Sequence, residues 1–292
     1  MTQIIDCFAP IAGRYRAAFV DLWGCLHNGY KPFPEAVAAL EGFRARGGIV
    51  ILLTNSPRPR PSVIRQLDKI GVPRDLYHDI AASGDASQFA LASGAVGNRV
   101  YHLGPERDLG FFADLPTDVL GDQVIERVAL EYATGIVCTG LFDDDTETPE
   151  DYRATLLYAK TKGLKLLCTN PDLIVDKGDK RIYCAGALAR AYEDMGGTSL
   201  YYGKPHPAIY DLARDRLAAI GDIANSEIIC IGDGIATDIA GAMAEDMDSL
   251  FITGGLAAAE TGTVDGKPDA GKLTAFLDRH MLSPQYAMGS LR

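Results

Sequence analysis

The sequence predicts an α/β protein in which a doubly wound, Rossmann-like parallel sheet carries an inserted α/β unit. Short apolar runs stop abruptly in polar residues, as buried parallel strands do, at Ala17–Asp21, Ile49–Ser56 and Glu227–Asp233. Segments with helical periodicity separate these runs, which is the β-α-β order of a doubly wound sheet. The middle of the chain has its own alternation of strands and helices.

The chain has 292 residues, and this length favours two domains. We expect a core made of residues 1–98 and 198–292, with an inserted α/β domain over residues 99–197 that we call the cap. An insertion of about a hundred residues is large enough to form a domain of its own.

The first part of the core opens with the strand that leads to Asp21. Phe33–Gly48 is predicted to be helical, with a proline in its first turn and two glycines at its end. Ile49–Ser56 is the next strand, and a helix closed by Gly71 follows it. The turn at Ser83 begins a further helix.

The cap is predicted to begin with a strand at Val100–Leu103. One of its helices is expected to begin at Thr148-Pro149-Glu150, with Thr148 as the N-cap residue and Pro149 in the first turn. The acidic run Asp143-Asp144-Asp145 is interpreted as a solvated loop. Further strands are expected near Val128–Tyr132, Gly135–Cys138 and Leu164–Cys168.

The core pattern is expected to resume with a strand at Leu200–Tyr202 and a helix that ends near Ile220. The strand Glu227–Ile231 leads into Asp233, and Ser249–Thr253 is the last predicted strand.

Composition excludes several classes of function. Hydrophobic residues make up 47% of the chain and the formal net charge is −11, which argues against nucleic acid polymers and anionic membranes as partners. No apolar run has the length of a membrane span, and we expect no signal peptide. The six cysteines contain no Cys-x-x-Cys pair, so we expect a reduced, cytoplasmic protein.

Polar residues of complementary chemistry follow the predicted strands. If the strands are parallel, these residues face one crevice, and together they suit phosphoryl transfer. A carboxylate can attack phosphorus, while Mg²⁺ prefers carboxylate and carbonyl oxygens. A hydroxyl and an ammonium can hold the phosphoryl oxygens. The residues are Asp21, Thr54 with Asn55, Lys204, and Asp233 with Asp238.

These segments resemble, in order, the four motifs of the haloacid dehalogenase superfamily. They read Asp21-Leu-Trp-Gly, Leu53-Thr-Asn-Ser, Gly203-Lys-Pro and Gly232-Asp-Gly-Ile-Ala-Thr-Asp. The large insertion, with Thr169-Asn-Pro-Asp and Ala185-Gly186 inside it, is similar to subfamily IIA, the NagD-like phosphatases with a C2-type cap.

The resemblance implies a role for each matching residue. Asp21 is the expected nucleophile and a Mg²⁺ ligand, together with the backbone carbonyl of Trp23 and with Asp233. Asp238 is expected at the same metal site, where it orients metal-bound water. Thr54 and the amide of Asn55 would bind the phosphoryl group, and Lys204 would neutralise it.

The cap is expected to select the substrate. The loop Asn170–Asp179, which includes Asp172, and the turn at Gly186 are the expected contacts. Related capped proteins often dimerise through the cap, so a homodimer is expected by analogy.

Trp23 departs from the family pattern. Most phosphatases of the superfamily carry a second Asp at this position as general acid and base, but an indole cannot transfer a proton. Such help is worth on the order of 10²–10⁴-fold. We therefore expect slow hydrolysis of alkyl phosphates and relatively faster hydrolysis of aryl phosphates. The alternative is that His27, His206 or a cap carboxylate transfers the proton instead.

The leading interpretation is a Mg²⁺-dependent phosphatase of a small phosphorylated metabolite, such as a sugar phosphate or nucleotide. A dehalogenase is an alternative, because dehalogenases carry an aromatic residue at the position of Trp23. However, dehalogenation needs no metal, and Asp233 and Asp238 are both present. A phosphometabolite-binding or regulatory protein with weak turnover is the other alternative.

Overall fold

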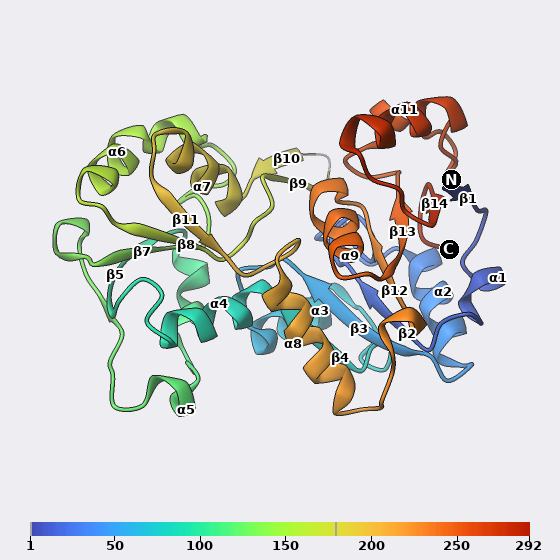
Figure 1. The fold of residues 1–292 in the computed structure, drawn as a ribbon, viewed down its shortest axis with the longest axis horizontal. Helices are drawn as coiled ribbons and strands as arrows, with labels where there is room; N and C mark the ends of the chain where they lie inside the picture. The colour runs from blue at the N-terminus through green and yellow to red at the C-terminus, as the bar shows by residue number, and fades with distance from the viewer. Residues whose placement is uncertain (1, 179) are drawn as a thin grey trace.

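The computed structural model describes residues 2–178 and 180–292. It contains two parallel sheets that lie side by side, with the chain entering and leaving the smaller one in mid-sequence (Figure 1). The predicted α/β class is confirmed. Among the described residues, no helix is long and apolar enough to cross a membrane.

The larger sheet has seven strands in the order β1-β14-β13-β12-β2-β3-β4, and every neighbouring pair is parallel. Strand β12 is the middle strand, and β2 lies between β12 and β3. The bounds are β1 Gln3–Ile4, β2 Ala17–Val20, β3 Ile49–Thr54, β4 Asp79–Ala82, β12 Ile228–Gly232, β13 Asp248–Ile252 and β14 Tyr286–Met288.

Helices cover both faces of this sheet, because successive residues of each buried strand point to opposite sides. Val20 and Leu52 pack with Leu40 of α2 on one face. Phe19 and Ile51 pack on the other face in the cluster that contains α8. The helices of the core are α1 Ala9–Ala12, α2 Pro34–Arg44, α3 Arg60–Ile70, α4 Ser83–Ala92, α8 Pro207–Ala218, η4 Asn225–Glu227, η5 Ile235–Ile239, α9 Ala240–Ala244, α10 Ala258–Thr261 and α11 Ala270–His280.

The smaller sheet has five parallel strands in the order β11-β8-β7-β5-β6. An antiparallel hairpin of β9 and β10 accompanies it. The strand bounds are β5 Arg99–Leu103, β6 Glu126–Arg127, β7 Gly135–Cys138, β8 Lys165–Cys168, β9 Ile174–Lys177, β10 Lys180–Tyr183 and β11 Thr198–Tyr201. The helical segments are η1 Glu106–Phe112, α5 Thr117–Leu120, η2 Leu130–Tyr132, η3 Pro149–Tyr152, α6 Arg153–Thr161 and α7 Ala185–Asp194.

Two predictions about the cap are corrected. The strand expected at Leu200–Tyr202 is β11, which pairs with β8 in the smaller sheet, so the chain does not return to the core at residue 198. Val128–Tyr132 is not a strand; its second half is the short 3₁₀ helix η2. An apolar run identifies a buried strand but does not say which sheet it joins.

Helix α4 lies between the two sheets and contacts both. At its first turn Asp85 accepts a hydrogen bond from the backbone N–H of Arg60 and pairs with Arg216 of α8 at 2.9 Å. Toward its other end, Ala90 and Leu91 pack with residues of β5, β7, β8 and η1. Gln88 donates to the carbonyl oxygens of η1 and of the residue that follows it. This helix therefore fixes the cap against the core.

Gly186 in the first turn of α7 supports the cap loop that reaches the core. A Cβ atom there would lie 2.2 Å from the carbonyl oxygen of Pro171 and 2.5 Å from that of Asp172. We predict that Gly186→Ala displaces this loop and destabilises the protein by about 1–3 kcal/mol, as overpacking does. Thermal or urea unfolding measures the change.

Gly42→Ala is the matched control, because Gly42 lies within α2 and a Cβ there meets nothing within 4 Å. Alanine favours a helix over glycine by about 0.8–1 kcal/mol, so this variant should be slightly more stable. A Gly186→Ala protein as stable as Gly42→Ala would contradict the close packing beneath the loop.

Candidate active site

The carboxyl ends of three neighbouring core strands meet a loop from the cap. Asp21 follows β2, Asp233 follows β12, and Thr54 ends β3. These strands are adjacent in the order β12-β2-β3, so their ends lie at one edge of the sheet. The predicted convergence of the strand-end residues is therefore found, with one difference: Lys204 arrives from the end of β11 in the smaller sheet.

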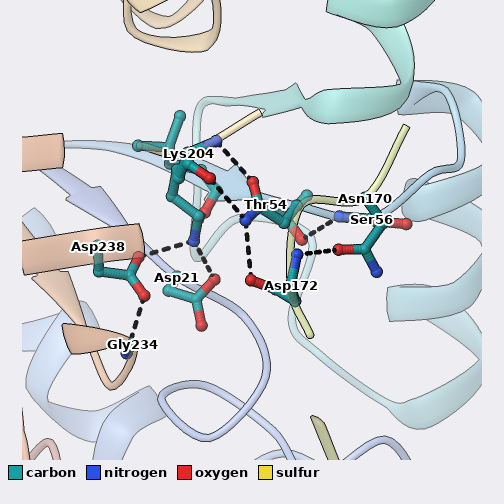
Figure 2. Close-up of polar contacts among 10 residues, drawn as sticks. Asp21, Thr54, Ser56, Asn170, Asp172, Lys204, Gly234 and Asp238 are labelled. Carbon is teal, nitrogen blue, oxygen red and sulfur yellow. Dashed lines mark hydrogen bonds and ion pairs between the residues drawn. The ribbon is translucent and has the colours of Figure 1, made fainter. Parts of the chain in front are cut away.

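The Lys204 ammonium is at the centre of the site (Figure 2). It is buried, and it donates to Asp21 Oδ1 at 2.5 Å, to Asp238 Oδ1 at 2.7 Å and to the carbonyl oxygen of Leu53 at 3.0 Å. These contacts use all three of its hydrogens. Burial lowers the pKa of Lys204, but the Asp21 and Asp238 carboxylates outweigh it and hold the pKa well above its ordinary value. The side chain is therefore a fixed cation.

Asp21, Asp233 and Cys25 form a compact group of possible metal ligands. One ligand atom from each lies within 4.8 Å of the others. Burial raises the pKa of Asp21 to about 7, although the Lys204 charge opposes this. Burial and then the Asp21 charge raise the pKa of Asp233 well above its ordinary value. A bound cation would stabilise the ionised form of both carboxylates.

Two glycines, Gly24 and Gly255, leave space for the Asp233 carboxylate beside the group of possible metal ligands. A Cβ at Gly24 or at Gly255 would lie 2.1 or 2.2 Å from Asp233 Oδ2. Gly24 also has a φ of +77°, which disfavours other residues. The donor set is rich in carboxylate oxygens and carries excess negative charge, and both properties suit Mg²⁺.

Asp238 lies beside Lys204 and lines the same cavity as Asp21 and Asp233. One of its oxygens accepts from Lys204, and the other accepts from the backbone N–H of Gly234 at 3.0 Å. Asp238 is not in the compact group with Asp21 and Asp233. Cys25 is in that group although sequence reasoning did not single it out. Its only signal is that it follows Asp21 by four residues in the same turn.

The side chain of Asn55 joins the core to the cap. Its Oδ1 accepts from the backbone N–H of Lys204 at 2.7 Å, which fixes the amide orientation. Its Nδ2 then donates to the Lys204 carbonyl at 3.2 Å and to Asp172 Oδ1 at 2.9 Å. Thr54 Oγ1 accepts from the backbone N–H of Ser56 at 3.1 Å. Both polar atoms of the Asn55 side chain therefore have hydrogen-bond partners within the protein.

A cavity of about 790 Å³ opens over these residues. Asp21, Trp23, Thr54 and Lys204 line it from one side, and Asn170 and Asp172 from the other. Asn170 Oδ1 accepts from the backbone N–H of Asp172 at 3.0 Å, which shapes the cap loop (Figure 2). Gly186 is not among the described lining residues and acts from behind the loop. Asp179, the end of the loop expected near the substrate, lies outside the described residues.

The two histidines considered from the sequence do not line the cavity. His27 is fully buried; its Nδ1 accepts from the backbone N–H of Gly29, and its Nε2 has no hydrogen-bond partner among the described residues. Burial lowers the pKa of His27 to about 4. The ring of His206 stacks on Tyr201, with centroids 5.2 Å apart.

Comparisons with known proteins agree with this architecture. Residues 18–115 match the model of the haloacid dehalogenase-like hydrolases, and residues 201–279 match the HAD-hydrolase-like model. The chain is similar to the crystal structure of a hydrolase of the haloacid dehalogenase-like family from Brucella suis 1330. The identity is 40%, the TM-score is 0.86, and the match covers 99% of this chain and 100% of the other.

Two more distant proteins complete the comparison. A p-nitrophenyl phosphatase from Archaeoglobus fulgidus shares the fold at 22% identity and a TM-score of 0.67, over 94% of this chain and 96% of that chain. The 5'-nucleotidase YutF of Bacillus subtilis is 25% identical over 86% of this chain and 92% of its own length. On the evidence of the full-length match to the Brucella hydrolase, the chain belongs to the haloacid dehalogenase-like hydrolases.

Proposed function

We propose that the chain is a Mg²⁺-dependent phosphatase that hydrolyses a small phosphorylated metabolite through an aspartyl phosphate on Asp21. The observation that carries the proposal is the buried contact of Lys204 with Asp21 and Asp238 beside Asp233. It combines a nucleophile, a fixed cation and a carboxylate site for a metal. The names of similar proteins support it, since they include a 5'-nucleotidase, a p-nitrophenyl phosphatase and a glycerol phosphate phosphatase.

Asp21 is proposed to attack phosphorus with its free carboxylate oxygen while Lys204 holds Oδ1. The Lys204 ammonium also offsets negative charge near the phosphoryl oxygens, and the Thr54 hydroxyl contributes a hydrogen bond to them. Bound Mg²⁺, held by Asp21, Asp233 and the carbonyl of Trp23, would supply charge neutralisation at the phosphoryl group. Asp238 keeps Lys204 in position.

The cap is proposed to choose the substrate and to exclude water. The lining residues Asn170 and Asp172 come from the cap, whereas the proposed nucleophile comes from the core. A leaving group in the cavity would therefore contact the cap. Exclusion of water strengthens the electrostatic interactions on which the transfer depends.

Asp21→Asn should abolish turnover, because the amide is a poor nucleophile. We expect kcat/KM for p-nitrophenyl phosphate to fall by more than about 10³-fold, with unchanged circular dichroism. Asp278→Asn, an exposed substitution on α11, is the control for loss of a negative charge and should leave kcat/KM unchanged. Near-normal phosphate release by Asp21→Asn would refute the assignment of the nucleophile.

Metal binding can be followed without substrate, because Trp23 is the only tryptophan of the chain and lines the cavity. As Mg²⁺ is added, the fluorescence of Trp23 should change and then level off when the site is full. Asp233→Asn should weaken the apparent affinity by at least about tenfold. Asp143→Asn, in the exposed acidic loop, should not change it. A titration that Asp143→Asn weakens and Asp233→Asn does not would place the metal in that loop instead.

A further inference from the structure

Hydrolysis of an unactivated phosphate ester needs a proton donor for the leaving oxygen, and position 23 offers only an indole. The Trp23 ring cannot give a proton, and it packs closely against Gly29. Two of its ring carbons would lie 2.5 Å from a Cβ at Gly29. The donor must therefore be another group that reaches the cavity.

The groups at the floor of the site are already engaged. Lys204 uses its three hydrogens on Asp21, Asp238 and the carbonyl of Leu53. Asp21 and Asp233 belong to the proposed nucleophile and metal site. His27 and His206 do not line the cavity.

Four further carboxyl groups line the cavity, and three of them form ion pairs. Asp108 pairs with Arg58 at 3.0 Å. Asp144 pairs with Arg107 at 2.7 Å, and Asp176 with Arg181 at 2.8 Å. Within residues 2–178 and 180–292, Asp172 is the lining carboxyl group outside the Asp21 cluster that has no ion-pair partner.

The contacts of Asp172 leave one oxygen for a proton. Its Oδ1 accepts from Asn55 Nδ2, whose orientation is fixed because Asn55 Oδ1 accepts from the Lys204 backbone. A proton on Asp172 therefore belongs on Oδ2, the oxygen not held by Asn55. Burial raises the pKa of Asp172; the Lys204 charge and the Asn55 hydrogen bond lower it, and the Asp238 charge raises it. The net direction is upward, which favours the protonated form.

We propose that Asp172 of the cap is the general acid and base of this enzyme, taking the task that Trp23 cannot perform. This role rests on the proposed function of Asp21. The bond from phosphorus to Asp21 forms as the bond to the leaving oxygen breaks. The leaving oxygen keeps the electron pair and takes the proton from Asp172 Oδ2. Water then attacks the phosphorus of the aspartyl phosphate and gives a proton to Asp172. The bond between phosphorus and Asp21 breaks in this step, so that phosphate is released and the Asp21 carboxylate is restored.

Asp172→Asn tests this role, because an asparagine oxygen can still accept from Asn55 but the side chain has no transferable proton. The variant and the wild type are compared by kcat/KM at saturating Mg²⁺ on glycerol 2-phosphate and on p-nitrophenyl phosphate. We expect a loss of about 10²–10³-fold on the alkyl ester and at most a few-fold on the aryl ester, whose leaving group needs little protonation. Asp172→Glu should recover part of the activity on the alkyl ester.

Asp194→Asn, in an exposed ion pair with Arg190 on α7 of the cap, is the control and should alter neither ester. If Asp172→Asn lowers kcat/KM equally for both esters, or for neither ester, Asp172 has at most a structural role in the loop and the proposal is overturned. Wild-type protein that releases phosphate from neither ester would instead overturn the proposed phosphatase function, and the role of Asp172 with it.

Discussion

The buried ammonium of Lys204 is the contact on which the rest of the site depends. It comes from the end of a cap strand and is held by Asp21 and Asp238 of the core. A buried charge is tolerated only when its partners are close and well oriented, and removal of one partner is costly. The position of the cap loop, the direction of the Asp21 carboxylate and the start of η5 are therefore set together.

Asn55 extends this arrangement from the charged centre to the cap side of the cavity. Its amide contacts the Lys204 backbone with both of its polar atoms and still reaches Asp172. Because an amide has a donor end and an acceptor end, the Lys204 contact decides which end faces the cap. A core residue at the end of β3 thus determines how a carboxyl group of the cap is presented to the cavity.

Local sequence pattern predicted the elements that are buried on both faces. Burial on both faces requires the continuous apolar runs that predict β2, β3 and β12. The left-handed backbone that ends α3 favours glycine, so Gly71 predicts the end of that helix. Those runs also led to Asp21, Thr54 and Asp233. Local pattern carries no information on sheet membership, which is why β11 was assigned to the core.

Contacts between distant parts of the chain had no comparable signal. Asn55 and Asp172 are 117 residues apart, and only the packing of the cap on the core brings them together. The thiol of Cys25 was missed for a different reason. A lone cysteine in an apolar stretch has the appearance of an ordinary core residue, and the nearby Asp233 enters from a different strand.

Helix α4 packs against both sheets and should therefore couple their folding. Its polar first turn is held by Arg60 and Arg216 of the core, while its apolar residues complete the hydrophobic cluster beneath the smaller sheet. Excision of the cap would leave Ala90 and Leu91 facing water, and loss of α4 would strip one face of the cap. The two units should consequently unfold in one transition, and neither is expected to be soluble when expressed alone.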